Sequence, residues 1–134
     1  MTTSLNSLGA ITLFVADPQR SKEFYARAFD APVVWEDPNS VVFKFENTVI
    51  NLLDIREAPG LIGPAGVAPG SAGARSQLTI WVDDAQAVCA RLAESGIELV
   101  NGPIDRPWNM RTAAFADPDG HIWEVAQELP APAA

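Results

Sequence analysis

The sequence predicts an α+β fold in which one unit, a strand followed by a helix and three further strands, occurs twice. The main observation is an internal repeat, because residues 78–84 (Leu-Thr-Ile-Trp-Val-Asp-Asp) align with residues 11–17 (Ile-Thr-Leu-Phe-Val-Ala-Asp) at an offset of 67, which is 78 minus 11. Each segment is an apolar run that ends at an Asp, a residue type that often caps the helix after it. A second observation is Asp-Pro-Asp-Gly at 117–120 between two apolar runs, which predicts a hairpin turn with Gly120 at positive φ.

The first copy of the unit begins with a strand at 9–16, where apolar residues occupy both faces as in a buried strand. Asp17 and Pro18 are typical of an N-cap and the first helical residue, so we expect a helix through about Phe29. Three short strands should follow at 32–35, 41–45 and 48–54, separated by turn-forming residues.

Residues 56–75 are dense in Gly, Pro and Ala and show little periodicity. A connection of this length is unusual inside a compact domain. Two interpretations stay open, a lid-like segment that covers a site and a passive linker between two modules.

The second copy predicts a helix at about 85–95 that ends at Gly96, a suitable residue for the left-handed position after a helix. Strands are expected at 97–100, 111–116 and 121–127. A chain of 134 residues suits one domain. We place this domain at 5–128, with modules at about 8–55 and 76–128 around the linker 56–75, and expect a disordered tail at 129–134.

Composition limits the possible partners. The chain has 9 Lys and Arg against 17 Asp and Glu, a net charge of −8, so we expect no nucleic-acid partner and a preference for cationic over anionic ligands. No apolar run approaches the roughly 20 residues of a membrane span. The N-terminus lacks the pattern of a secretory signal, so we expect a cytoplasmic protein that does not enter a membrane. The single Cys89 is expected to be a small buried residue.

Two motifs carry a family resemblance, Val-Ala-Asp at 15–17 leading into Ser-Lys-Glu-Phe-Tyr at 21–25, and the closing segment 117–124. With them the chain resembles, from about Leu8 to Gln127, the vicinal oxygen chelate superfamily. This superfamily contains glyoxalase I, extradiol dioxygenases, and the bleomycin- and fosfomycin-resistance proteins. The resemblance implies two βαβββ modules whose mixed sheets curl around a cup-shaped cavity, with helices outside, and often a homodimer.

Metal-dependent members of that superfamily place ligands on the first and last strands of each module. By the resemblance these positions fall on Ala10, Asn51, Gln77 and Glu124. Only Glu124 is a strong metal ligand, and the single histidine, His121, faces away from it by strand alternation. We therefore expect no metal and no other cofactor, as in the metal-free bleomycin-resistance-like members.

Strand alternation also predicts which side chains line the cup. Aromatic and aliphatic walls with a few polar groups are typical of small-molecule pockets. Trp108 is expected just before the penultimate strand, where it could stack on a planar ligand. The alternative is that Trp81 and Trp108 are ordinary core or dimer-interface residues. The candidate ligand-binding residues are Phe14, Asn51, Gln77, Trp81, Trp108, Met110 and Glu124.

Three functions fit these residues. The first is a metal-free, antibiotic-binding type of protein that sequesters an aromatic or cationic small molecule. The second is a metal-independent lyase or isomerase in which Glu124 is the general base, and Asn51 and Gln77 stabilise a developing oxyanion. The third is a non-catalytic interaction module.

Overall fold

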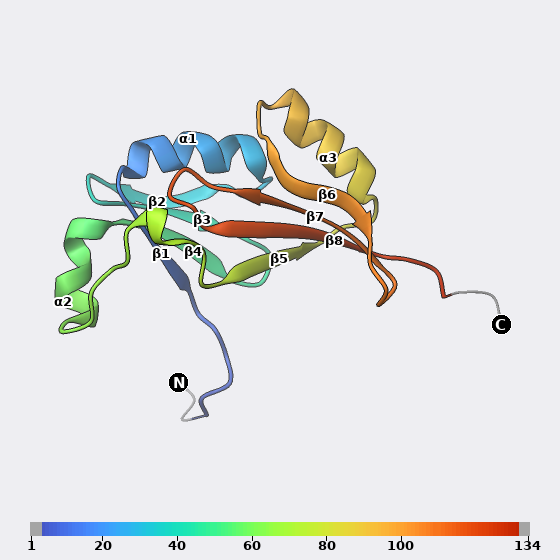
Figure 1. The fold of residues 1–134 in the computed structure, drawn as a ribbon. Coiled ribbons are helices and arrows are strands. Elements are labelled where there is room, and N and C mark those ends of the chain that lie inside the picture. Colours follow the sequence, from blue (N-terminus) through green and yellow to red (C-terminus); the bar gives the residue numbers. More distant parts are fainter. Residues whose placement is uncertain (1–3, 132–134) are drawn as a thin grey trace. The chain divides into compact units, whose positions relative to one another are not determined.

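Two four-stranded mixed sheets form the framework of the protein, each with a helix on one face (Figure 1). The computed structural model describes residues 4–131. The chain divides after Ala68 into two compact units, and each unit contains one βαβββ module. The predicted α+β class and the tandem arrangement are confirmed. Within the described residues, no helix is both long enough and apolar enough to cross a membrane.

In the first unit the strand order is β1-β4-β3-β2, with β1 parallel to β4 and the other pairs antiparallel. The core lies between the sheet and α1, where Tyr25 is fully buried against Phe43, with ring centroids 5.9 Å apart. The elements are β1 (Ile11–Val15), α1 (Pro18–Ala28), β2 (Val33–Asp37), β3 (Ser40–Lys44) and β4 (Val49–Asp54).

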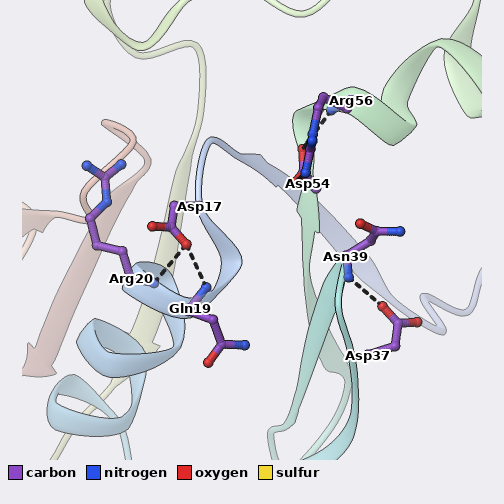
Figure 2. A network of polar contacts seen from close by, with 7 residues as sticks. All are labelled: Asp17, Gln19, Arg20, Asp37, Asn39, Asp54 and Arg56. Carbon is purple, nitrogen blue, oxygen red and sulfur yellow. Dashed lines mark hydrogen bonds and ion pairs between the residues drawn. The ribbon is translucent and has the colours of Figure 1, made fainter.

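The start of α1 is fixed by the residues that the sequence indicated. The Asp17 carboxylate accepts hydrogen bonds from the backbone N–H groups of Gln19 and Arg20, at 3.0 and 3.3 Å (Figure 2). Pro18 is the first helical residue. Its lack of an N–H costs no hydrogen bond there, because the N–H of the first helical residue has no partner within the helix. The predicted N-cap is therefore confirmed.

The connection after β4 contains more regular structure than its composition predicts. It begins with a 3₁₀ turn (Ile55–Glu57), continues into the short helix α2 (Ala58–Ile62), and has a second 3₁₀ turn at Gly70–Ala72. Asp54 starts this segment, because its buried carboxylate accepts hydrogen bonds from the backbone N–H and from the guanidinium of Arg56 (Figure 2). A Cβ on Gly70 would lie 2.8 Å from the carbonyl oxygen of Asp119, so this end of the connection packs closely against the β7–β8 turn.

The contact between Asp54 and Arg56 predicts a specific acid sensitivity. Hydrogen bonds from Arg56 lower the pKa of Asp54, so this carboxylate stabilises the fold above its unfolded pKa of about 3.9 and loses that effect as the pH falls through the lower folded value. Arg56→Gln should therefore lower the free energy of unfolding at neutral pH. It should also make stability fall less steeply between about pH 5 and pH 2. Urea unfolding at several pH values measures both effects.

The control for this variant is Lys22→Gln, which removes an ion pair to Glu36 in which both side chains are about one-third exposed. Exposed pairs contribute little, so this control should change the acid profile less than Arg56→Gln. Equal changes in the acid dependence of stability in the two variants would show that the burial of Asp54 does not strengthen its contact with Arg56.

In the second unit the strand order is β5-β8-β7-β6, with β5 parallel to β8. Helix α3 packs against β6, β7 and β8 and covers the buried side chains of Trp123 and Phe115. The elements are β5 (Gln77–Trp81), α3 (Ala85–Glu94), β6 (Leu99–Asp105), β7 (Met110–Ala116) and β8 (Ile122–Glu128).

Three predicted turn signals of this unit are confirmed. Asp84 caps α3 by accepting a hydrogen bond from the backbone N–H of Ala87. Gly96 has φ of 79°, and Gly120, in the β7–β8 turn, has φ of 89°. Both glycines take a backbone conformation that other residues rarely adopt.

The structure differs from the sequence prediction at β6 and at the C-terminus. β6 extends to Asp105 and contains two register shifts, whereas the sequence predicts a strand at 97–100. Leu129 and Pro130 belong to the predicted disordered tail, yet Asn109 holds both of them. Its backbone carbonyl accepts from the Leu129 N–H, and its amide nitrogen donates to both their carbonyls. Residues 132–134 of that tail lie outside the described residues.

Candidate functional site

Each sheet has one face that its own helix does not cover, and we call this its open face. On the second sheet the open face carries every second residue of β5, β7 and β8. Strand register assigns it Gln77, Thr79, Trp81, Met110, Thr112, Ala114, Ala116, Ile122, Glu124, Ala126 and Glu128. All three β5 residues of this face are exposed.

Glu124 lies in the middle of this open face. It is the register partner of Thr79 on the parallel strand β5. The Thr79 hydroxyl donates a hydrogen bond of 2.9 Å to Glu124 Oε1. Among residues 4–131 the carboxylate has no cationic partner, so it offers a negative charge that a ligand could pair with.

Trp81 lies on the same face as this carboxylate, two residues after Thr79 along β5 and opposite Ala126. Its side chain is 73% exposed, so its ring is available for stacking. A hollow of about 370 Å³ lies beside it, lined by Trp81, Val82, Asp83, Ala126, Gln127 and Glu128. The hollow therefore combines one aromatic wall with two carboxylates, at Asp83 and Glu128.

Gln77 shares this face but lies opposite Ile122 rather than Glu124. The structure thus brings Glu124 and Thr79 together, and Gln77 lies two residues before Thr79 along β5. Thr79 is not among the candidate ligand-binding residues that the sequence predicts. Its importance could have been recognised from the repeat, because Thr12 occupies the equivalent position in the first unit.

Met110 and Trp108 lie at the start of β7 and in the turn before it. Met110, the first residue of β7, pairs with Glu128, which is four residues from Glu124 along β8, or about 13 Å. Trp108 lies in the turn before β7 and is 64% exposed. The Arg106 guanidinium lies over its ring, 5.9 Å from the centroid, so a cation would meet like charge beside Trp108.

Arg106 is a candidate site residue that sequence reasoning missed. Its Nε donates a hydrogen bond of 2.9 Å to the hydroxyl of Thr112, which pairs with Ala126 on the face of Glu124. The guanidinium therefore lies against the open face of the second sheet. No sequence signal placed it there, because the register shifts of β6 interrupt strand alternation just before Arg106.

The open face of the first sheet has a polar pair at the equivalent place. Asn51 is the register partner of Thr12, and its amide nitrogen donates a long contact of 3.5 Å to the Thr12 hydroxyl. The side-chain oxygen of Asn51, Oδ1, is buried and accepts no hydrogen bond in the part of the chain that the structure describes. Phe14 lies nearby, opposite Leu53.

Trp35 also faces the open side of the first sheet, because it pairs with Val42, which in turn pairs with Asn51. Its side chain is 59% exposed, and its indole N–H donates to Asp37. A second hollow, of about 350 Å³, lies on this unit and is lined by Asp37, Asn39, Ser40, Leu53, Glu57, Gly60 and Leu61. Trp35 was not among the predicted ligand-binding residues.

A family model described as the Glyoxalase/Bleomycin resistance protein/Dioxygenase superfamily matches residues 7–125. The chain belongs to this superfamily. It is 31% identical over 123 residues to the uncharacterised protein YraH of Bacillus subtilis strain 168, covering 89% of this chain and 96% of that protein.

Solved structures of the superfamily share its fold. A glyoxalase/bleomycin resistance protein/dioxygenase from Nocardioides superposes with a TM-score of 0.81 at 24% identity, covering 99% of this chain and 93% of that chain. TnmS3, an antibiotic binding protein from Streptomyces sp. CB03234, superposes with a TM-score of 0.71 at 26% identity, covering 95% and 99% of the two chains.

The donor set of this superfamily member suits a metal poorly. Within residues 4–131 there is no group of three or more His, Cys, Asp or Glu residues placed to hold a metal ion. The Thr79 hydroxyl donates a hydrogen bond to Glu124. The ligand positions that the resemblance implies at Ala10 and Gln77 supply a methyl group and an amide. Neither group is a strong ligand for zinc or iron.

Proposed function

We propose that the chain binds a small aromatic cation on the open face of its second sheet, without a metal ion. The observation that carries this proposal is the Glu124 carboxylate, which has no cationic partner among the described residues and shares its face of the sheet with the exposed Trp81. The likeness to TnmS3, an antibiotic binding protein, supports a ligand-binding role of this kind. The homodimer that the resemblance implies stays a prediction.

Three physical effects favour a cationic ring at this place. A cation over an indole gains roughly 0.5–2 kcal/mol, and Trp81 offers a free ring face. Asp83 and Glu128 add negative charge to the adjacent hollow. The net charge of −8 attracts cations over a Debye length of about 8 Å at physiological ionic strength.

The proposal is tested by calorimetric titration with benzylamine and 2-naphthylmethylamine, with benzyl alcohol as the neutral comparison. We expect the amines to bind more tightly than the alcohol and less tightly in high salt. Glu124→Gln should weaken amine binding roughly tenfold or more, and Trp81→Ala about two- to thirtyfold. Trp108→Ala should weaken amine binding less than Trp81→Ala does, because Arg106 lies over the Trp108 ring.

Glu94→Gln, on α3, is the matched control for the loss of one negative charge and should leave binding unchanged. Equal binding of the alcohol and the amines, or no effect of Glu124→Gln, would contradict the proposal. If no probe binds, the interaction-module alternative gains support.

The enzymatic alternative is distinguished by following the fate of the ligand. Glu124 accepts a hydrogen bond from Thr79 while its second carboxylate oxygen has no bonded partner among the described residues, which is also an arrangement that a general base could use. Conversion of a bound compound by the wild type but not by Glu124→Gln, with binding retained in the variant, would favour a lyase or isomerase.

A further inference from the structure

Two side chains of opposite charge on the open face of the second sheet each lack a charged partner. Within the part of the chain that the structure describes, Glu124 accepts a hydrogen bond from Thr79 alone. Arg106 donates to Thr112 and lies over Trp108, and neither contact neutralises its charge. Within residues 4–131, neither Glu124 nor Arg106 takes part in an ion pair.

The strand register places Glu124 and the residue that Arg106 contacts at neighbouring positions of this face. Thr112 pairs with Ala126 and Ala114 pairs with Glu124, so Thr112 is the diagonal neighbour of Glu124. Diagonal neighbours on antiparallel strands lie about 7–8 Å apart. Ala114 and Ala126 complete this set of four register positions and are small and buried, and the hydrogen bond from Arg106 to the Thr112 hydroxyl brings the guanidinium to the Thr112 position.

The contacts of the Arg106 guanidinium leave part of it available to a ligand. The Thr112 hydroxyl occupies Nε, and the Trp108 ring lies against the group, so its two terminal nitrogens remain as donors. A planar guanidinium with free terminal donors suits a carboxylate, which it binds with two hydrogen bonds. A phosphate would bring a second negative charge toward Glu124 and Glu128, and we therefore favour a carboxylate.

We propose that the ligand of this face is a zwitterion, whose cationic group binds to Glu124 and whose carboxylate binds to Arg106. This inference rests on the proposed function and adds a second charged group to the ligand. It also modifies the expectation from net charge, which by itself favours a simple cation.

The test compares two probes that differ only in the carboxylate. 4-(Aminomethyl)benzoate is a zwitterion with its charges at opposite ends of a ring, and its methyl ester is a simple cation. Calorimetry should show that the wild type binds the zwitterion roughly tenfold or more tightly than the ester. Arg106→Gln should abolish this difference, and Arg106→Lys should keep only part of it, because lysine retains the charge but not the planar fork.

Arg91→Gln on α3, which packs on the other face of the sheet, controls for the change in net charge and should retain the full preference. Thermal melts of each variant show whether Arg106→Gln only loosens the β6–β7 hairpin, in which case both probes would lose affinity equally and the inference would fail.

The outcomes separate this inference from the proposed function. If both probes bind equally to the wild type and both need Glu124, the zwitterion is ruled out and the cation site stands. If Arg106 sets a preference for the carboxylate while Glu124→Gln has no effect, the cation site fails and the face binds carboxylates alone. If neither probe binds, both proposals fail.

Discussion

Gly102→Ala should lower the free energy of unfolding by about 2–5 kcal/mol, combining backbone strain with overpacking. Gly102 has φ of 95°, a conformation that alanine adopts only with strain. An added Cβ would lie 2.5 Å from the carbonyl oxygen of Thr112 and 2.6 Å from Cα of Ala113. Both atoms belong to the backbone of β7, which is paired on both sides and cannot shift alone.

Two other glycines separate the causes of this effect. Gly73 has φ of 98° with no atom within 4 Å of an added Cβ, so Gly73→Ala should show the cost of strain alone. Gly66 has neither a positive φ nor a close neighbour, so Gly66→Ala should change stability little. Urea unfolding of the three variants gives the comparison. A cost for Gly102→Ala no larger than for Gly73→Ala would show that the close approach of β6 to β7 is not a constraint.

The sequence could predict most of the fold because the signals for it are local. Asp17 and Asp84 cap helices, and Gly96 and Gly120 have the positive φ values that their positions require. These features depend on a residue and its neighbours within a few positions, so no tertiary information is needed. The repeat then indicates that the same unit folds twice.

The sequence could predict only part of the candidate site. Alternation correctly places Glu124 and Trp81 on one face, because β5 and β8 pair without a register shift. It could not place Arg106, because β6 contains two register shifts and each shift changes which face the following residues occupy. Met110 pairs with Glu128, four residues from Glu124 along β8, and this separation depends on strand pairing that the sequence does not show.

The tryptophans allow a direct test of which aromatic residues form the core. Trp123 is 2% exposed beneath α3, whereas Trp81 and Trp108 are mostly exposed. From the sequence, a core position for Trp81 and Trp108 stays an open alternative. Their exposure in the chain excludes a core role within the described residues and leaves them available for a ligand or a partner.

Trp123→Ala should lower the free energy of unfolding by about 3–5 kcal/mol, because removing a buried indole loses its transfer free energy and leaves a cavity under α3. Trp108→Ala, the matched substitution in the same unit, should cost about 1 kcal/mol or less, mainly its contact with Arg106. Urea unfolding followed by far-ultraviolet circular dichroism measures both without relying on tryptophan fluorescence. If Trp108→Ala cost as much as Trp123→Ala, Trp108 would be buried in an interface in solution. Its ring would then not be free to orient Arg106 for a ligand.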